Sequence, residues 1–163
     1  MRKNKMRRQY RSRSNVTKII YVLLSFILLV VLYKCTTYLF HPERKVEDVI
    51  NQFYTLEQTQ DFSSSWELFH SSMKEKFDKS TYIQDRSHVF FNHFGVDTFS
   101  FTYTKLNELA SWKMDDSRET LTGVYEYLVI TTYKSKYGNI EMRQNVYLTL
   151  ENEKWVILWD YNF

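Results

Sequence analysis

The sequence predicts an α+β protein in which an N-terminal membrane-spanning helix precedes three helices packed on a curved antiparallel sheet. Three observations predict this fold class. A stretch of 22 residues near the N-terminus contains a single charge, residues 42–94 place apolar side chains at helical spacing, and from residue 96 the apolar period falls to two. Helices that precede a run of strands with short connections favour helices on one face of a sheet over alternating β-α-β units.

The predicted anchor runs from Ile19 to Phe40 (residues 19–40). In a helix, 22 residues extend about 33 Å, which matches the hydrocarbon core of a bilayer. Lys34 is the one charge within it and lies near the C-terminal end, where a long side chain reaches the interface. The lipid bilayer is therefore the first predicted partner. A cleaved signal peptide is the alternative, although the large residues that follow Leu32 are unsuited to a cleavage site.

Charge is distributed unevenly on the two sides of this stretch. Residues 1–18 contain eight Lys or Arg and no acidic residue, whereas residues 41–163 contain thirteen basic and nineteen acidic residues, a net charge of −6. The basic excess before the span predicts a cytoplasmic tail over residues 1–18 and an extracytoplasmic domain over residues 41–163. An acidic domain disfavours nucleic acid as a partner because it repels phosphates.

Cys35 is the only cysteine, so the predicted outer domain contains none. The outer domain is therefore expected to have no disulfide and no cysteine-based metal site, so packing alone must stabilise it. Extracytoplasmic domains without disulfides are ordinary in Gram-positive bacteria and less usual in eukaryotic secretion. The predicted location is therefore the plasma membrane of a Gram-positive bacterium, as a single-pass protein.

Two helices are predicted at the start of the domain. The first covers residues 42–58, with Pro42 in its first turn and acidic residues near its N-terminus. The second is short and begins at a capping box formed by Ser64 and Glu67. Their apolar faces consist of Val46, Val49, Ile50, Phe53 and Tyr54 in the first and Trp66, Phe69 and Met73 in the second.

A third helix is predicted from residue 81 to residue 94. Ser80 is its expected N-cap, and Gly95 is expected to end it in the left-handed conformation that glycine adopts without strain. Asp85 and His88 lie three positions apart on this helix, a spacing at which two side chains can pair along its surface.

An antiparallel meander is predicted after Gly95, because the strands alternate and their connections are short. Segment 106–119 is either a bulged continuation of the first strand or a packed connection. In the last strand Trp155, Ile157 and Trp159 alternate on one face, so Trp155 is predicted to be buried. The clearly alternating stretches are residues 96–104, 120–133, 140–150 and 154–160.

The order of elements, the domain size and the last strand, KWVILWD at residues 154–160, resemble the nuclear-transport-factor-two-like superfamily. In that superfamily a cone of curved sheet is closed by N-terminal helices. The segments NQFY at residues 51–54 and WELFH at residues 66–70 are similar to the helical half, and the resemblance covers nearly all of residues 42–163. It implies a cone-shaped domain like the anchored accessory domains of cell-wall enzymes and conjugation machinery.

Some members of this superfamily are isomerases or dehydratases that use an Asp or an Asp–His pair inside the cone, so the resemblance implies pocket candidates. These are Asp61, Asp85, His88 and Glu126. Asp61 follows the first helix and could simply cap the next one. Glu126 alternates in phase with Val124 and Leu128, and it either points at the helices or lies at the rim of the sheet. Together they form no recognisable catalytic set.

No metal ion or cofactor is predicted. The four histidines, at positions 41, 70, 88 and 93, lack the spacing of known metal motifs, and capping or surface positions are their commoner role. The sequence contains no Gly-rich phosphate loop and no Gly-x-Ser-x-Gly elbow. Aromatic residues make up 29 of 163, and these rings either fill the cone or line an apolar pocket.

The predicted function is therefore a non-catalytic protein-interaction or accessory module that binds another protein of the bacterial cell envelope. The alternative is a small-molecule-binding protein or an enzyme that uses the cone pocket. A third hypothesis is a homo-oligomer formed through the exposed sheet face. Several of the thirteen tyrosines are expected on that face, because tyrosine is favoured at interfaces. A filled core favours the first hypothesis, and an open pocket with buried carboxylates favours the second.

Overall fold

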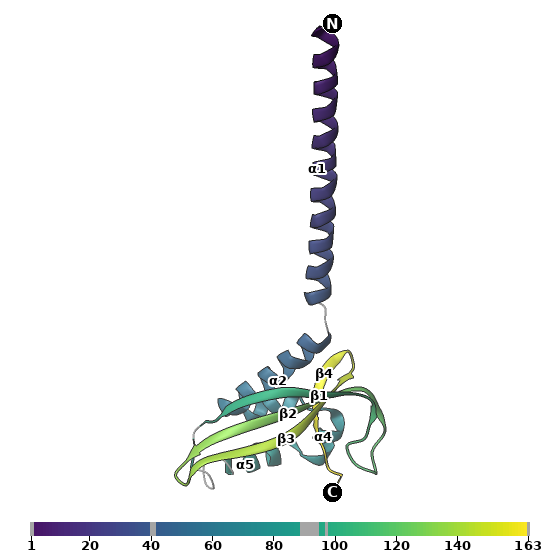
Figure 1. Cartoon of the computed structure of the whole chain (residues 1–163). Coiled ribbons are helices and arrows are strands. Elements are labelled where there is room, and N and C mark those ends of the chain that lie inside the picture. The colour runs from purple at the N-terminus through teal and green to yellow at the C-terminus, as the bar shows by residue number, and fades with distance from the viewer. Residues whose placement is uncertain (1, 40–41, 89–94, 97, 163) are drawn as a thin grey trace. The chain divides into compact units, whose positions relative to one another are not determined.

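The structure is a computed structural model that describes residues 2–39, 42–88, 95–96 and 98–162, without the side chains of residues 2–16, 35, 37–39 and 42. The described chain contains five helices and one four-stranded antiparallel sheet (Figure 1). It divides into two units, Met1–Arg44 and Lys45–Phe163. The predicted α+β class is confirmed.

Helix α1 (Arg2–Leu39) joins the basic tail and the apolar stretch in one continuous helix. Within it, Thr17–Lys34 has a mean hydropathy of 2.0, and none of this window is buried inside the protein. In the described part of the chain this is the one helix long and apolar enough to cross a membrane. A signal sequence close to an N-terminus has the same properties. The predicted end of the anchor, Phe40, lies outside the described residues.

Helix α2 (Pro42–Gln58) has the predicted bounds. Four residues of the predicted stripe, Val46, Ile50, Phe53 and Tyr54, are buried, and the fifth, Val49, is half-buried. The apolar period of 3.6 was therefore sufficient to locate both the helix and the face that contacts the core.

The second predicted helix is in fact two helices, α3 (Phe62–Glu67) and α4 (Ser71–Lys76). The predicted capping box is wrong, because Asp61 is the N-cap of α3 and its carboxylate accepts the backbone N–H of Ser64 at 3.1 Å. Asp61 therefore has the capping role that was considered for it, and Ser64 lies inside the first turn.

Pairing with the last strand explains the interruption between α3 and α4. The backbone N–H of His70 donates to the carbonyl of Ile157 at 3.0 Å, and the N–H of Ile157 donates to the carbonyl of Leu68 at 2.9 Å. Phe69 thereby forms a parallel bridge with Ile157. These residues satisfy their backbone groups through the sheet, so a continuous helix is not needed there.

Helix α5 (Lys79–His88) begins two residues before the predicted start. Its cap is Asp78 rather than Ser80, because one Asp78 oxygen accepts the backbone N–H groups of both Ser80 and Thr81 at 3.1 Å. The predicted continuation to residue 94 lies outside the described residues. Gly95 has φ +59°, the left-handed conformation expected of it.

The sheet has the order β1-β2-β3-β4, and each strand is antiparallel to the next. A register shift between Lys105 and Asn107 leaves Leu106 as a bulge, so segment 106–112 is a bulged continuation of the first strand. The strands are β1 (Ser100–Trp112), β2 (Leu121–Ser135), β3 (Gly138–Glu151) and β4 (Lys154–Trp159).

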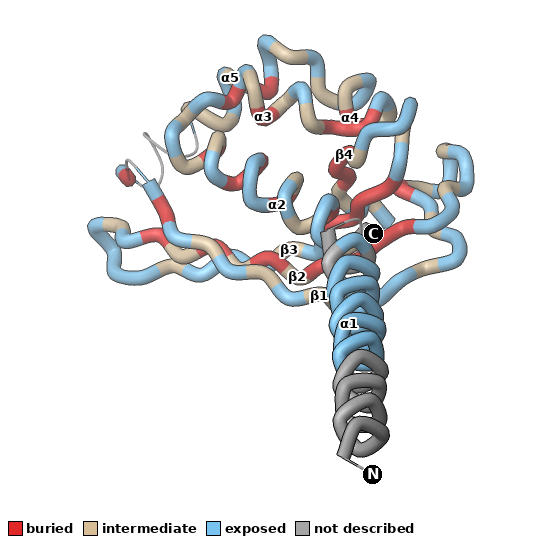
Figure 2. Tube along the Cα trace, turned by 90° about the horizontal axis from the view of Figure 1, so that it is seen from above, coloured by how far each residue is buried: buried red, intermediate tan, exposed pale blue. Residues whose placement is uncertain are grey.

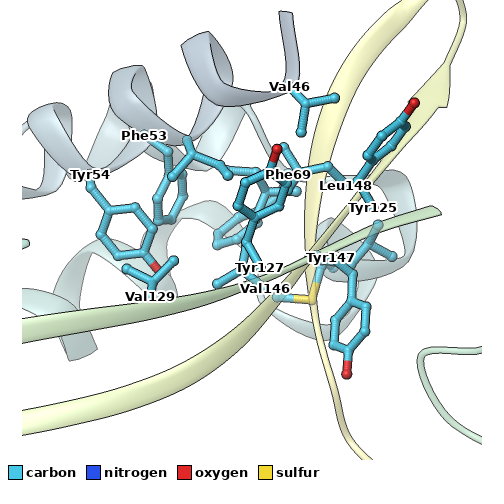
Figure 3. Close-up of a cluster of buried hydrophobic side chains, with 14 of the residues drawn as sticks. Val46, Phe53, Tyr54, Phe69, Tyr125, Tyr127, Val129, Val146, Tyr147 and Leu148 are labelled. Carbon is cyan, nitrogen blue, oxygen red and sulfur yellow. The ribbon is translucent and has the colours of Figure 1, made fainter. Parts of the chain in front are cut away.

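Helices α2 to α5 lie on one side of the sheet, here called the inner face (Figure 2). Side chains of β2 and β3 on this face pack against aromatic residues of the helices (Figure 3). The ring of Phe69 lies within 5.2 Å, centroid to centroid, of the rings of Phe53, Tyr82 and Trp159. Aromatic rings therefore fill much of the space between helices and sheet.

The prediction for Trp155 in β4 is only partly met. Ile157 is fully buried, but Trp155 is half-buried, and its ring packs nearly perpendicular to that of Tyr125 with the ring centroids 5.4 Å apart. Val156 and Leu158, on the opposite side of the strand, are buried as well. Both sides of β4 are covered, so alternation alone could not show which side is the core.

The chain itself covers the outer face beside β4. Trp112, at the end of β1, stacks on Tyr147 of β3 with ring centroids 4.1 Å apart. Tyr147 projects to the side opposite Tyr127 (Figure 3). After β4 the chain returns to the same region, where the N–H of Tyr161 donates to the carbonyl of Met114 at 2.9 Å. Apolar side chains therefore also pack on the outer side of the sheet beside β4.

Candidate functional site

Among the described residues, the most deeply buried carboxylate belongs to Glu57, on the inward side of α2, with 1% of its surface exposed. Residue 57 follows Ile50, Phe53 and Tyr54 at intervals of seven, four and three, so the helix turns it to the same side as the apolar stripe. Sequence reasoning missed it, although this spacing was the available signal.

Four donor atoms from α3 and α5 surround the Glu57 carboxylate. Glu57, Ser65, Tyr82 and Arg86 are here called the Glu57 cluster. One oxygen accepts the hydroxyls of Ser65 and of Tyr82, the latter at 2.8 Å. The other accepts Nε of Arg86 at 2.7 Å and lies 2.5 Å from an Nη atom of the same guanidinium. Burial raises the pKa of the Tyr82 hydroxyl well above its ordinary value, so it stays protonated and donates.

The Glu57 cluster joins α2, α3 and α5 and is chemically saturated. Both oxygens already accept hydrogen bonds from side chains of the same chain, and the cation that neutralises the carboxylate is Arg86. A general base needs an oxygen directed at a substrate proton. The geometry therefore suits a structural clamp between helices.

A second buried carboxylate, Glu126 of β2, lies on the outer face and is 9% exposed. It accepts Asn107 Nδ2 at 2.6 Å, Asn145 Nδ2 at 3.1 Å and the hydroxyl of Tyr147 at 3.1 Å. Burial raises the pKa of Tyr147 to about 12, so this hydroxyl also stays protonated as a donor. Glu126 points away from the helices, so the first of the two interpretations given for it is wrong.

The four predicted pocket candidates do not converge. Asp61 caps α3, and Asp85 and His88 are exposed on α5. Glu126 accepts the hydroxyl of Tyr147, which projects to the side opposite Tyr127, so Glu126 lies on the far side of the sheet from these helices. The sheet therefore separates Glu126 from the other three residues.

One hollow of about 420 Å³ lies where β1 begins. Its described lining includes none of the four candidates, and Lys134 is the one charged residue among the described lining residues. Its described lining is Gly95, Val96, Thr98, Phe99, Ser100, Thr132 and Lys134.

Helices α2 to α5 leave the rest of the outer face uncovered. It is here called the outer-face patch, and its rows run across three strands: Thr104 beside Leu128 and Asn145, and Thr102 beside Ile130 and Arg143. The β1 and β3 members are exposed and the β2 members are half-buried. Leu128 and Ile130 lie at its centre, between threonines on one side and Arg143 and Asn145 on the other.

The expectation that tyrosines mark this face is wrong. Tyr103, Tyr125, Tyr127 and Tyr133 are paired with residues of the inner face, where they help to fill the core. Tyr147 points outward but is stacked beneath Trp112. The alternation was predicted correctly, but the tyrosines were expected on the wrong side of the sheet, because both sides contain apolar residues.

His70 has the capping role expected of such histidines. Its Nδ1 accepts the backbone N–H of Ser72 at 3.1 Å at the start of α4, and its Nε2 lies 3.5 Å from Glu151. Burial lowers the pKa of the His70 imidazole, while the nearby Glu151 charge partly opposes this. Protonation of Nδ1 would also remove the acceptor for Ser72.

The folded protein should therefore lose stability as the pH falls below about 6.5, the ordinary histidine pKa, because the unfolded chain takes up the proton more readily. His70→Asn keeps a capping acceptor but does not titrate. Thermal unfolding between pH 7.5 and 5 should show a smaller decrease in Tm for this variant than for the wild type. Parallel curves for the two proteins would contradict the assignment.

Comparison with known proteins adds no relative: no family model matches the chain, and no curated protein matches it by sequence.

Proposed function

We propose that this protein is a single-pass membrane protein of a bacterial envelope whose outer domain is a non-catalytic interaction module. The observation that carries the proposal is the outer-face patch, a well-formed sheet face on the side opposite helices α2 to α5. A face centred on Leu128 and Ile130 and flanked by Arg143 offers apolar area and a charge with which to orient a partner.

The state of the buried carboxylates supports a role without catalysis. Glu57 and Glu126 each accept at least three hydrogen bonds from their own chain. Neither is arranged as an acid or base beside an open cavity. We include in the proposal the nuclear-transport-factor-two-like cone, which the helices on one face and the long antiparallel strands support.

The membrane topology is part of the same proposal. Eight basic residues before the span and a net charge of −6 after position 40 support a cytoplasmic N-terminus and an external domain. The partner is then a protein with an exposed domain at the same membrane surface. Gram-positive bacteria are the favoured source, because the outer domain lacks cysteine.

Site-specific photocrosslinking in intact cells tests the proposal. A photoreactive residue at Ile130 should give one discrete product with another envelope protein, and the same residue at Asp85, exposed on α5, should not. Arg143→Glu should reduce the Ile130 product. Equal products from both positions, or no product together with a small molecule that copurifies with the domain, would favour the ligand-binding alternative.

A further inference from the structure

The two edges of the sheet differ in whether their backbone groups are paired with another segment of the chain. The outer edge of β4 is occupied, because residues 68–70 donate to and accept from Ile157. At the other edge, β1 has β2 as its one paired neighbour among the described residues. At the start of this edge, just before β1, Nε2 of Gln58 donates to the carbonyl of Phe99 at 2.6 Å.

The first part of β1 lacks the usual protection of an edge strand. Natural edges carry charges, prolines or bulges that prevent pairing with other chains. Residues 100–104, with the sequence SFTYT, contain neither charge nor proline, and Lys105 and the bulge at Leu106 come only after them. These five residues therefore offer a regular, uncharged strand edge.

The backbone groups of this edge can be assigned from the strand geometry. The carbonyl of Phe99 points toward Gln58 and away from β2. Successive residues of a strand direct their N–H and C=O groups to opposite edges, so Phe101 and Tyr103 present theirs to the free edge. Ser100, Thr102 and Thr104 face β2 with their backbones, and their side chains are exposed on the outer face.

We propose that two copies of this chain associate through β1, antiparallel, with Thr102 facing Thr102 of the second copy. In this register Phe101 of each copy faces Tyr103 of the other as a hydrogen-bonded pair, and Ser100 faces Thr104. Aromatic pairs and Thr–Thr or Ser–Thr pairs are the cross-strand combinations that stabilise antiparallel sheets. The segment is therefore complementary to itself about a two-fold axis at Thr102.

This symmetry and the predicted anchor favour a second copy of the chain, rather than a strand of another protein, as the partner of the β1 edge. About four backbone hydrogen bonds form in such a pairing, which is modest for molecules free in solution. Anchoring in one membrane raises the effective concentration of copies relative to each other, so a small interface is sufficient. The pairing would also make two outer-face patches continuous, but it does not depend on what binds them.

A disulfide at the symmetry axis tests the register. In a Cys35→Ser background of the full chain, Thr102→Cys places two thiols in a non-hydrogen-bonded pair with Cα atoms about 4.5 Å apart, within disulfide range. Mild oxidation of membranes should convert most of the chain to a reducible species of about twice 19.9 kDa. The matched control Thr104→Cys places its two thiols four residues apart, about 13 Å, and should remain monomeric.

Coexpression of Ser100→Cys and Thr104→Cys chains should restore the dimer, because these positions face each other. Thr102 is exposed, so its replacement should leave the near-ultraviolet circular dichroism and the Tm unchanged. A Thr102→Cys chain that stays monomeric while folded, or that crosslinks no better than Thr104→Cys, would overturn the proposal. Capture of a different protein at position 102 would also overturn the proposal. These results would not decide the proposed function, which is tested separately by crosslinks from Ile130.

Discussion

Arg86→Ala should destabilise the outer domain by about 3–5 kcal/mol, because it leaves the fully buried Glu57 carboxylate without its cation. The Arg86 side chain is 20% exposed and that of Glu57 is 0% exposed. Without the two guanidinium contacts to one of its oxygens, the buried Glu57 carboxylate keeps a negative charge that no cation compensates. Thermal or urea unfolding of the full chain in detergent, followed by tryptophan fluorescence, measures the effect.

The surface pair of Lys79 and Glu67 is the matched control. Its Nζ–O distance of 2.6 Å is comparable to those of the buried pair, but the Glu67 side chain is 58% exposed. Lys79→Ala should therefore cost less than about 1 kcal/mol. Equal effects of the two substitutions would contradict the clamp role of the Glu57 cluster.

A paired replacement separates the charge from the packing. Glu57→Gln combined with Arg86→Met removes both charges and keeps most of the volume, so it should recover part of the stability that Arg86→Ala loses. A double variant less stable than Arg86→Ala would indicate that hydrogen bonds from Ser65 and Tyr82 matter more than the ion pair.

This cluster illustrates what the sequence could predict. Residue 57 continues the stripe of Ile50, Phe53 and Tyr54, and Arg86 follows Tyr82 by one helical turn, so both positions were within reach of the helical period. Their pairing was not, because it depends on how α2 and α5 are placed in three dimensions. A polar residue in an apolar stripe is therefore a better site signal than an isolated Asp or His.

The sheet shows a different limit. The strands and their order followed from alternation and short turns. Of the two interpretations of segment 106–119, the bulged continuation of the first strand is correct up to residue 112. Which side of the alternation meets the helices did not follow, since Val124, Leu128 and Ile130 are as apolar as Tyr125 and Val129. For that reason the side of Glu126 was left open, and several tyrosines were expected on the wrong face.

The division of the second helix at residues 68–70 depends on tertiary structure in the same way. No glycine or proline marks it, and the residues pair instead with β4, which is far away in the sequence. Local propensity favours continuing the helix, and the backbone hydrogen bonds to Ile157 oppose that continuation.

Phe69→Ala should cost about 3–5 kcal/mol, the usual range for truncating a buried aromatic ring. Phe69 is 0% exposed and contacts the rings of Phe53, Tyr82 and Trp159, so its removal leaves a cavity where α2, α5 and β4 meet. The same residue holds the strand-like link to Ile157, so its ring anchors the connection between α3 and α4.

Trp155→Ala is the comparison that distinguishes this account from the one the sequence suggests. Trp155 is half-buried and has one ring contact, with Tyr125, so its truncation should cost clearly less than Phe69→Ala. Phe69→Leu, which keeps most of the apolar volume, should cost less as well. If Trp155→Ala proved the more damaging in unfolding experiments, the centre of the core would lie at the N-terminal end of β4, as alternation alone predicted, and not at the bridge of Phe69 with Ile157.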